Sequence, residues 1–272
     1  MVLLAALFHA VWNALVKTNA DRLSMMAWIG ITNSLAMLPL IPFTPWPTPE
    51  VWHIIFLSLL FHIGYKLFLV QAYTHGDYGQ VYPLARGLAP AFITAIGFLF
   101  LGEQLSLNTT LAIALIVLGI ISLAWRKAAP GAMHQHHGVY YAIGTALFIA
   151  AYTLNDALGG RTAASPHIYI IWSFLLDGVL ISAVAWWRRG AELFRPRKEW
   201  LIGGAGGLLS LTAYWIIIWA MSVSPVGPVA ALRETSVVIA ALISGYFMKE
   251  GLGARALIAT CIVASGIVLL KV

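Results

Sequence analysis

Six ionisable side chains lie inside long apolar stretches of the sequence, where a charge is costly. Three are basic and three are acidic: Lys66, Arg86, Arg233, Asp156, Asp177 and Glu234. An Arg, Lys or Asp at the centre of a membrane-spanning helix costs about 2.5–3.5 kcal/mol on insertion scales. Such residues pair with each other or face a polar cavity. A balanced set therefore predicts a chamber that suits a small ligand with charges of both signs.

Two arginines are the sharpest members of this set. Arg86 lies about 8 residues into its apolar stretch, or ~12 Å along a helix, and Arg233 lies about 6 residues into another, or ~9 Å from the opposite face. A guanidinium at such depth can tie helices together through carbonyls or through carboxylates such as Glu234 and Asp177. It can also bind a ligand carboxylate or phosphate as a planar fork. The sequence leaves both roles open, and we expect at least one arginine to contact the ligand.

The remaining candidates are polar and aromatic residues that recur one or two helical turns apart. We predict that the following bind the ligand together with Arg86 and Arg233: Lys66, Tyr82, His9, Trp12, Asn13, Tyr65, Tyr152, Trp215 and Trp219. Aromatic rings in this set can pack the bundle or enclose an ammonium group. Four residues are candidates for proton coupling, with structural ion pairing or packing as the alternative: Asp177, Glu234, Asp156 and His62. No motif predicts a metal site, a cofactor or a hydrolytic centre.

The composition predicts an integral membrane protein. The chain has 272 residues with 16 basic and 10 acidic side chains, 61% hydrophobic residues and a mean hydropathy of +0.87. About 25% of residues are charged in an ordinary soluble domain, so that class is excluded. So many apolar residues also exclude a disordered chain, and the single Cys261 excludes a disulfide scaffold. The basic residues lie at the ends of apolar stretches, which argues against nucleic acid as a partner.

Ten apolar stretches are long enough for membrane helices, at about 20 residues each. They cover approximately 1–17, 24–43, 51–74, 78–101, 106–125, 138–157, 166–187, 200–223, 227–248 and 253–270. Within lipid such segments must be helical, because an open sheet edge cannot satisfy its backbone groups. The predicted fold is therefore all-α, with ten transmembrane helices.

An internal repeat divides the ten stretches into two sets of five. An offset of 148 places Trp52 on Trp200, and an offset of 147 places Arg86 on Arg233 and Glu103 on Glu250. Five is odd, so the second copy enters the membrane from the opposite side. We predict two inverted five-helix repeats, residues 1–126 and 138–272, joined by a cytoplasmic linker at 127–137. This architecture is typical of secondary transporters.

The distribution of Lys and Arg predicts the orientation. Eleven lie in connections on the side opposite the termini, whereas only Arg161 and Lys271 lie on the side of the termini. Cytoplasmic loops carry the excess of basic residues. We therefore predict a multi-pass protein of a bacterial inner membrane with both termini outside the cytoplasm.

Three segments carry a family resemblance that covers the whole chain: Leu7–Lys17, Tyr82–Pro90 and Leu101–Glu103. With five plus five helices in fewer than 300 residues, the chain resembles the EamA-like branch of the drug/metabolite transporter superfamily. The resemblance implies transport of a small metabolite, since relatives move amino acids, nucleotide sugars and organic cations. Relatives are usually drawn with cytoplasmic termini, whereas the charges here indicate the reverse.

These observations together predict a transporter and not an enzyme. We expect alternating access for an amino acid or related zwitterion, with export favoured by analogy with relatives and with proton coupling as an option. Alternatives are a choline-like cation, which the aromatic residues favour, and a phosphorylated or phosphonate metabolite, which the arginines favour. A different class, an integral membrane enzyme that modifies lipid, would need reactive groups at the interface. The expected partners are lipid and a small molecule, and the expected state is a monomer or weak dimer.

Overall fold

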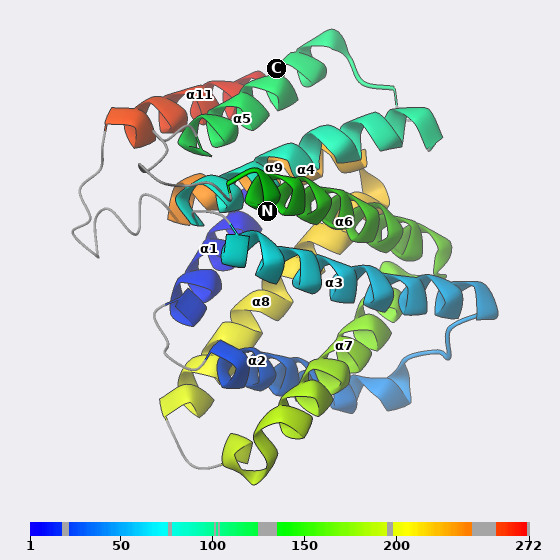
Figure 1. Cartoon of the computed structure of the whole chain (residues 1–272). Coiled ribbons are helices and arrows are strands. Elements are labelled where there is room, and N and C mark those ends of the chain that lie inside the picture. Colours follow the sequence, from blue (N-terminus) through cyan, green and yellow to red (C-terminus); the bar gives the residue numbers. More distant parts are fainter. Residues whose placement is uncertain are drawn as a thin grey trace. The chain divides into compact units, whose positions relative to one another are not determined.

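In the computed structural model the described residues fold into helices and their connections (Figure 1). The structure describes residues 1–17, 22–75, 78–100, 102, 104–124, 135–194, 198–240 and 254–270. No strand occurs in these ranges. The helices are α1 (Val2–Lys17), α2 (Arg22–Met37), α3 (Pro49–His75), α4 (Tyr78–Phe100), α5 (Leu107–Ala124), α6 (Gln135–Thr162), α7 (Pro166–Arg189), α8 (Lys198–Val223), α9 (Val226–Glu234) and α11 (Ala254–Leu270), with 3₁₀ helices η1 (Leu38–Phe43) and η2 (Gly190–Phe194).

The all-helical membrane class is confirmed. Among the described residues, six helical segments are long and apolar enough to cross a bilayer: Leu23–Phe43, Pro49–Ala72, Val81–Phe100, His137–Thr162, Pro166–Phe194 and Trp200–Val223. Three shorter apolar helices accompany them: Val2–Leu15, Leu107–Ser122 and Ile258–Leu270. The total of ten spans stays a prediction.

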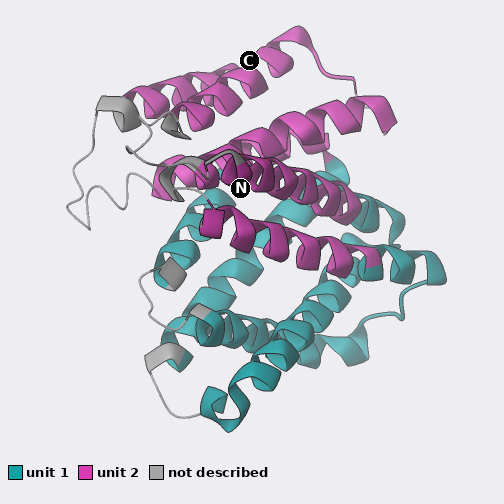
Figure 2. Cartoon of the chain, viewed as in Figure 1, with its two compact units in different colours: residues 1–56, 158–223 teal, residues 57–157, 224–272 magenta. Residues whose placement is uncertain are grey.

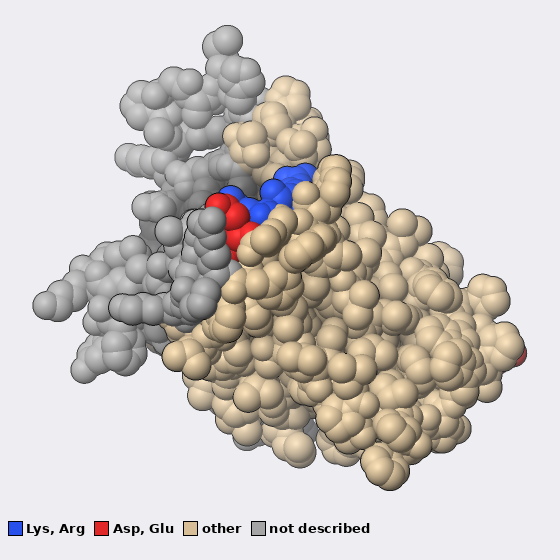
Figure 3. Space-filling model, turned by 90° about the horizontal axis from the view of Figure 1, so that it is seen from below, with Lys and Arg blue, Asp and Glu red and all other residues tan. Residues whose placement is uncertain are grey.

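The outer surface suits a lipid solvent. Large apolar side chains are exposed on most helices, for example Leu67 at 63%, Leu201 at 82% and Val268 at 65%. A soluble monomer rarely exposes apolar patches of this extent. Figure 3 shows a face on which most of the charged atoms gather in one area, with one further acidic spot at the edge of the view.

The predicted stretch 24–43 agrees with the helical segment Leu23–Phe43. Its backbone changes from α helix to 3₁₀ helix after Met37, because Pro39 cannot donate a backbone bond and disfavours an α conformation in the residue before it. The stretch predicted at 138–157 continues further than expected, since α6 ends at Thr162. A Cβ at Gly159 would collide with the ring of Tyr169, so the glycine serves close helix packing and not a turn.

The stretch 227–248, predicted as one helix, is interrupted. Helix α9 ends at Glu234, and Thr235 forms a turn before helical backbone resumes at Ser236. The Thr235 amide bonds to Leu232 O at 3.3 Å, and its Oγ1 donates to the same oxygen at 2.6 Å. A side-chain hydroxyl that bonds to the backbone in this way competes with regular helix. The irregularity immediately follows the charged pair Arg233–Glu234.

The chain forms two compact units (Figure 2). Unit 1 consists of residues 1–56 and 158–223, and unit 2 of residues 57–157 and 224–272. Each unit thus takes helices from both sequence halves. In unit 1, α2 packs against α7 and α1 against α8. In unit 2, α4 packs against α9 and α5 against α11, the last pair lying side by side in Figure 1.

Three of these helix pairs join equivalent stretches of the two predicted repeats. The pairs α2/α7, α4/α9 and α5/α11 match the second, fourth and fifth predicted stretches of each half. A helix packs against its own copy when a two-fold axis passes between them. The contacts therefore agree with a repeat, while the division at 127–137 stays a prediction.

Glycines let the helices of unit 1 approach closely in the segment Gly203-Gly204-x-Gly206-Gly207. A Cβ at Gly207 would lie 2.7 Å from Thr32 Cβ and 3.0 Å from Ile29 O, both on α2. Gly204, one turn earlier on α8, has only Thr32 Oγ1 at 3.8 Å. Small residues at helix contacts are the usual means of packing helices in membranes.

Candidate functional site

A buried cluster of three charges joins α4 and α9 in unit 2. Arg86, Arg233 and Glu234 are 4%, 2% and 0% exposed. Glu234 Oε1 accepts hydrogen bonds from Arg233 Nε at 3.0 Å and from Arg233 Nη2 at 2.9 Å. Glu234 Oε2 lies 2.8 Å from Arg86 Nε, an ion pair that lacks hydrogen-bond geometry. One carboxylate therefore serves two guanidinium groups.

Small side chains allow the two arginines to meet. Helix α4 packs against α9, and both helices carry fully buried alanines within one turn of their arginine: Ala85, Ala89, Ala230 and Ala231. The two arginines are also the residues that the repeat superposes. Equivalent residues come together in this way when they lie near a two-fold axis.

Helix α6 adds a hydroxyl and an aromatic ring to the cluster. Arg233 Nη2 donates to Thr153 Oγ1 at 3.2 Å, and Thr153 is 1% exposed. Arg233 Cζ lies 5.9 Å from the centroid of the Tyr152 ring, within the range of a cation–π contact. Arg233 is thus fixed by α6 as well as by Glu234.

Aromatic side chains extend the cluster along α3 and α4. The Tyr152 ring stacks on His62 at 4.3 Å with an interplanar angle of 25°, and meets Tyr65 edge-on at 5.7 Å. Tyr65 packs on the buried cluster that contains Tyr152 and Ala89 of α4, and Tyr82 packs on the cluster that contains Ala231 of α9. The predicted candidates on α3, α4, α6 and α9 therefore converge in one region of unit 2.

A second polar group lies beside this aromatic wall. Ser58 Oγ donates to Asp156 Oδ1 at 2.5 Å, and both residues are buried. His62, one turn after Ser58 on α3, has its Nδ1 2.9 Å from Ser58 O and 3.3 Å from Ser58 Oγ. Because the serine proton goes to the carboxylate, this set does not have the order of a hydrolase triad, in which histidine takes the serine proton.

The other predicted residues divide between the units. Lys66 lies on α3 in unit 2 and is half-buried. In unit 1, Trp12 contacts the His9 ring edge-on at 5.1 Å, and Asn13 Nδ2 donates to His9 O at 2.7 Å. The remaining unit 1 candidates are Asp177 on α7 and two tryptophans on α8: Trp215, which donates to His167 Nδ1 at 3.0 Å, and Trp219, which is 37% exposed.

Two contributing residues were missed from the sequence, Ser58 and Thr153. Ser58 precedes His62 by four residues, so helical spacing alone could have joined it to the polar face of that stretch. Thr153 precedes Asp156 by three residues on α6 and could have been found in the same way. Neither is charged, so neither stood out in an apolar stretch.

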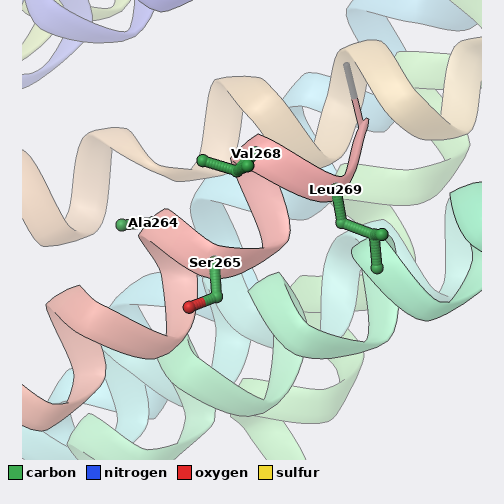
Figure 4. Close-up of a pocket in the computed structure, with 4 residues that line it drawn as sticks. All are labelled: Ala264, Ser265, Val268 and Leu269. Atoms are coloured by element: carbon green, nitrogen blue, oxygen red, sulfur yellow. The ribbon is translucent and has the colours of Figure 1, made fainter. Parts of the chain in front are cut away.

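A surface hollow of ≈ 490 Å³ lies elsewhere, on α11 (Figure 4). Its lining residues are Ala264, Ser265, Val268 and Leu269. The Ser265 hydroxyl is engaged by Cys261 O at 2.9 Å. None of the candidate residues lines this hollow, and it offers no charged group.

A buried charge cluster within apolar helices defines a multi-pass membrane protein with a polar interior. The model of the EamA-like transporter family matches residues 1–125 and 136–272. The chain belongs to this family, which confirms the resemblance to the drug/metabolite transporter superfamily. The family assigns membrane transport as the general activity, and the two matched segments follow the two sequence halves.

Solved structures support the fold. Twenty-nine chains match significantly. One of them, titled "Crystal structure of protein", has a TM-score of 0.74 and 19% identity and covers 100% of this chain and 98% of that chain. At this identity the likeness concerns the fold alone. A comparison with curated proteins gave no match.

Proposed function

We propose that this protein is a ten-helix secondary transporter of an amino acid or a related zwitterion. The observation that carries the proposal is the buried Arg86–Glu234–Arg233 cluster, joined to an aromatic wall in a chain of the EamA-like transporter family. Membrane charges at this depth mark substrate or ion pathways. The substrate carboxylate binds at the arginines, with Arg86 as its principal ligand.

We assign the two arginines different roles in the proposed site. Arg233 is held by Glu234 through two nitrogens and by Thr153, and we assign it a positioning role. Arg86 is oriented by Glu234 through Nε. A guanidinium carries five N–H donors, so it can serve a ligand carboxylate while it is paired with a glutamate. Glu234 thereby pre-organises the basic pair.

The aromatic wall complements the other end of an amino acid. The ring of Tyr152 lies 5.9 Å from Arg233 Cζ. An amino acid bears its carboxylate and its ammonium on one carbon atom. A carboxylate at the arginines therefore leaves the ammonium close to Tyr152, where the negative face of the ring attracts a cation.

The interruption after Glu234 and the repeat support alternating access. Transporters with repeated halves place substrate sites at discontinuous helices near the midplane. Here the break at Thr235 directly follows the charged pair. We propose export across a bacterial inner membrane with both termini outside, for which the eleven-to-two asymmetry of basic residues is the support.

A phosphorylated or phosphonate metabolite is the second candidate, because two guanidinium groups also suit a phosphate. A choline-like cation would have to bind near both arginines, which opposes it. The order Asp156–Ser58–His62 gives the lipid-modifying enzyme no activated serine.

A thermal-shift screen of the purified protein tests the proposal. Amino acids, organophosphates and quaternary amines are compared on the wild type, on Arg86→Lys and on the control Arg161→Lys. Arg161 is exposed and donates to Met221 O at 3.0 Å. A ligand at 100 times its Kd adds about 2.7 kcal/mol of stability. We expect amino acids to stabilise the wild type and the control but not Arg86→Lys.

Stabilisation by quaternary amines alone would overturn the substrate class. If the same amino acid stabilises Arg86→Lys and Arg161→Lys equally, Arg86 does not bind the substrate.

A further inference from the structure

The contacts of His62 determine where it can take up a proton. Ser58 has a single hydroxyl proton, and the 2.5 Å contact assigns it to Asp156 Oδ1. His62 Nδ1 therefore has no serine proton to accept and donates its own to Ser58 O at 2.9 Å. In this tautomer Nε2 carries the lone pair. Within the described part of the chain, no side chain hydrogen-bonds to His62 Nε2.

Two neighbours border the His62 imidazole. The Tyr152 ring stacks on it at 4.3 Å with an interplanar angle of 25°. The face of an aromatic ring attracts a cation. The buried Asp156 is joined to His62 through Ser58. A histidine is the side chain whose charge ordinarily changes between about pH 5 and 8.

We propose that His62 is a proton-binding site that competes with the ammonium group of the substrate for Tyr152, so that substrate and proton bind in exchange. This inference rests on the proposed function. Tyr152 is shared, since His62 stacks on its ring and the Arg233 guanidinium lies 5.9 Å from its centroid. A substrate ammonium placed there by the arginines meets a second cation whenever His62 is charged.

The charged and titratable groups of this region of unit 2 lie on four helices. They are Tyr65 and Lys66 on α3, Tyr82 and Arg86 on α4, Tyr152 and Asp156 on α6, and Arg233 and Glu234 on α9. Exchange with an inward flow of protons would drive the substrate outward, as export requires.

The test compares two ligands that differ by one amine. The strongest-binding standard amino acid and the carboxylic acid that lacks only its amine are titrated between about pH 5.5 and 8. If one proton leaves for each amino acid bound, the Kd rises up to about tenfold for each unit that the pH falls. The acid without the amine should instead bind as well or better at low pH, because a protonated His62 attracts a carboxylate.

The matched control is His53, an exposed residue on the same helix whose Nδ1 lies 2.6 Å from Pro49 O. We expect His53→Gln to keep the wild-type pH dependence and His62→Gln to lose it for both ligands. A wild-type pH dependence that persists in His62→Gln, or an amino acid affinity that is constant with pH in the wild type, would overturn the inference.

A further measurement separates this inference from the proposed function. If no carboxylate ligand binds at any pH, the proposed function has failed. NMR of ¹³C-labelled histidine in the ligand-free protein then tests the proton site directly. The resonance that is missing from His62→Gln must move between about pH 5.5 and 8, and Asp156→Asn must alter that movement. A resonance that does not move contradicts the proton site.

Discussion

Replacing Glu234 by glutamine tests whether this carboxylate holds the basic pair together. Glu234 is fully buried and contacts Arg86 at 2.8 Å and Arg233 at 2.9 and 3.0 Å. Glutamine has one acceptor oxygen, so its amide can serve Arg233 but then turns an N–H donor toward Arg86. Removing one partner of a buried ion pair costs about 3–5 kcal/mol. At about 2–4 °C per kcal/mol for a chain of this size, the melting temperature should fall by roughly 6–20 °C.

The assay is thermal unfolding of the detergent-solubilised protein, with Glu50→Gln as the control. Glu50 is exposed in the first turn of α3, where a carboxylate stabilises a helix by about 0.3–1 kcal/mol. Its loss should lower the melting temperature by no more than ~4 °C. A carboxylate ligand should stabilise Glu234→Gln more than the wild type, because it restores a negative charge to the arginines. Equal melting temperatures for Glu234→Gln and the wild type would refute this reasoning.

Three further predictions concern the positioning arginine, helix packing and topology. Arg233→Lys keeps the charge but loses one or two charge-assisted hydrogen bonds, at about 1.5–3 kcal/mol each. Its melting temperature should therefore fall while its affinity for the amino acid is retained. Lost affinity without lost stability would show that Arg233 binds the substrate directly. Gly207→Ala should destabilise by about 1–3 kcal/mol through overpacking, whereas Gly204→Ala should unfold like the wild type; equal effects in thermal melts would contradict the packing. A cysteine at position 195 should be protected from a membrane-impermeant thiol reagent in intact cells, and one appended after Val272 should be labelled; the opposite labelling would reverse the orientation.

Much of the helical framework was predictable because apolar length and prolines are local signals. The start of α7 at Pro166 and the end of α8 at Val223 agree with the predicted stretches. The break at Thr235 was not predictable in this way. It depends on a side-chain bond to Leu232 O, which the polar run Arg233–Ser236 does not by itself reveal. The predicted stretch 138–157 ended before Gly159, whose packing partner Tyr169 lies on the next helix.

The sequence predicted which residues belong to the candidate site better than it predicted which residues they contact. Burial cost singled out Arg86, Arg233 and Glu234, and the repeat related the two arginines. The sequence offered Glu234 and Asp177 equally as counter-ions, and only the packing of α4 against α9 selects Glu234. The bond between Ser58 and Asp156 joins residues 98 positions apart, a separation that no helical period encodes.

An experimental structure of the protein with its strongest-binding amino acid tests the central claim most directly. We predict a ligand carboxylate within about 2.7–3.2 Å of the Arg86 guanidinium and an ammonium group over the ring of Tyr152. A ligand bound at His9, Trp12 or Trp215 in unit 1, with no atom at Arg86, would contradict the account.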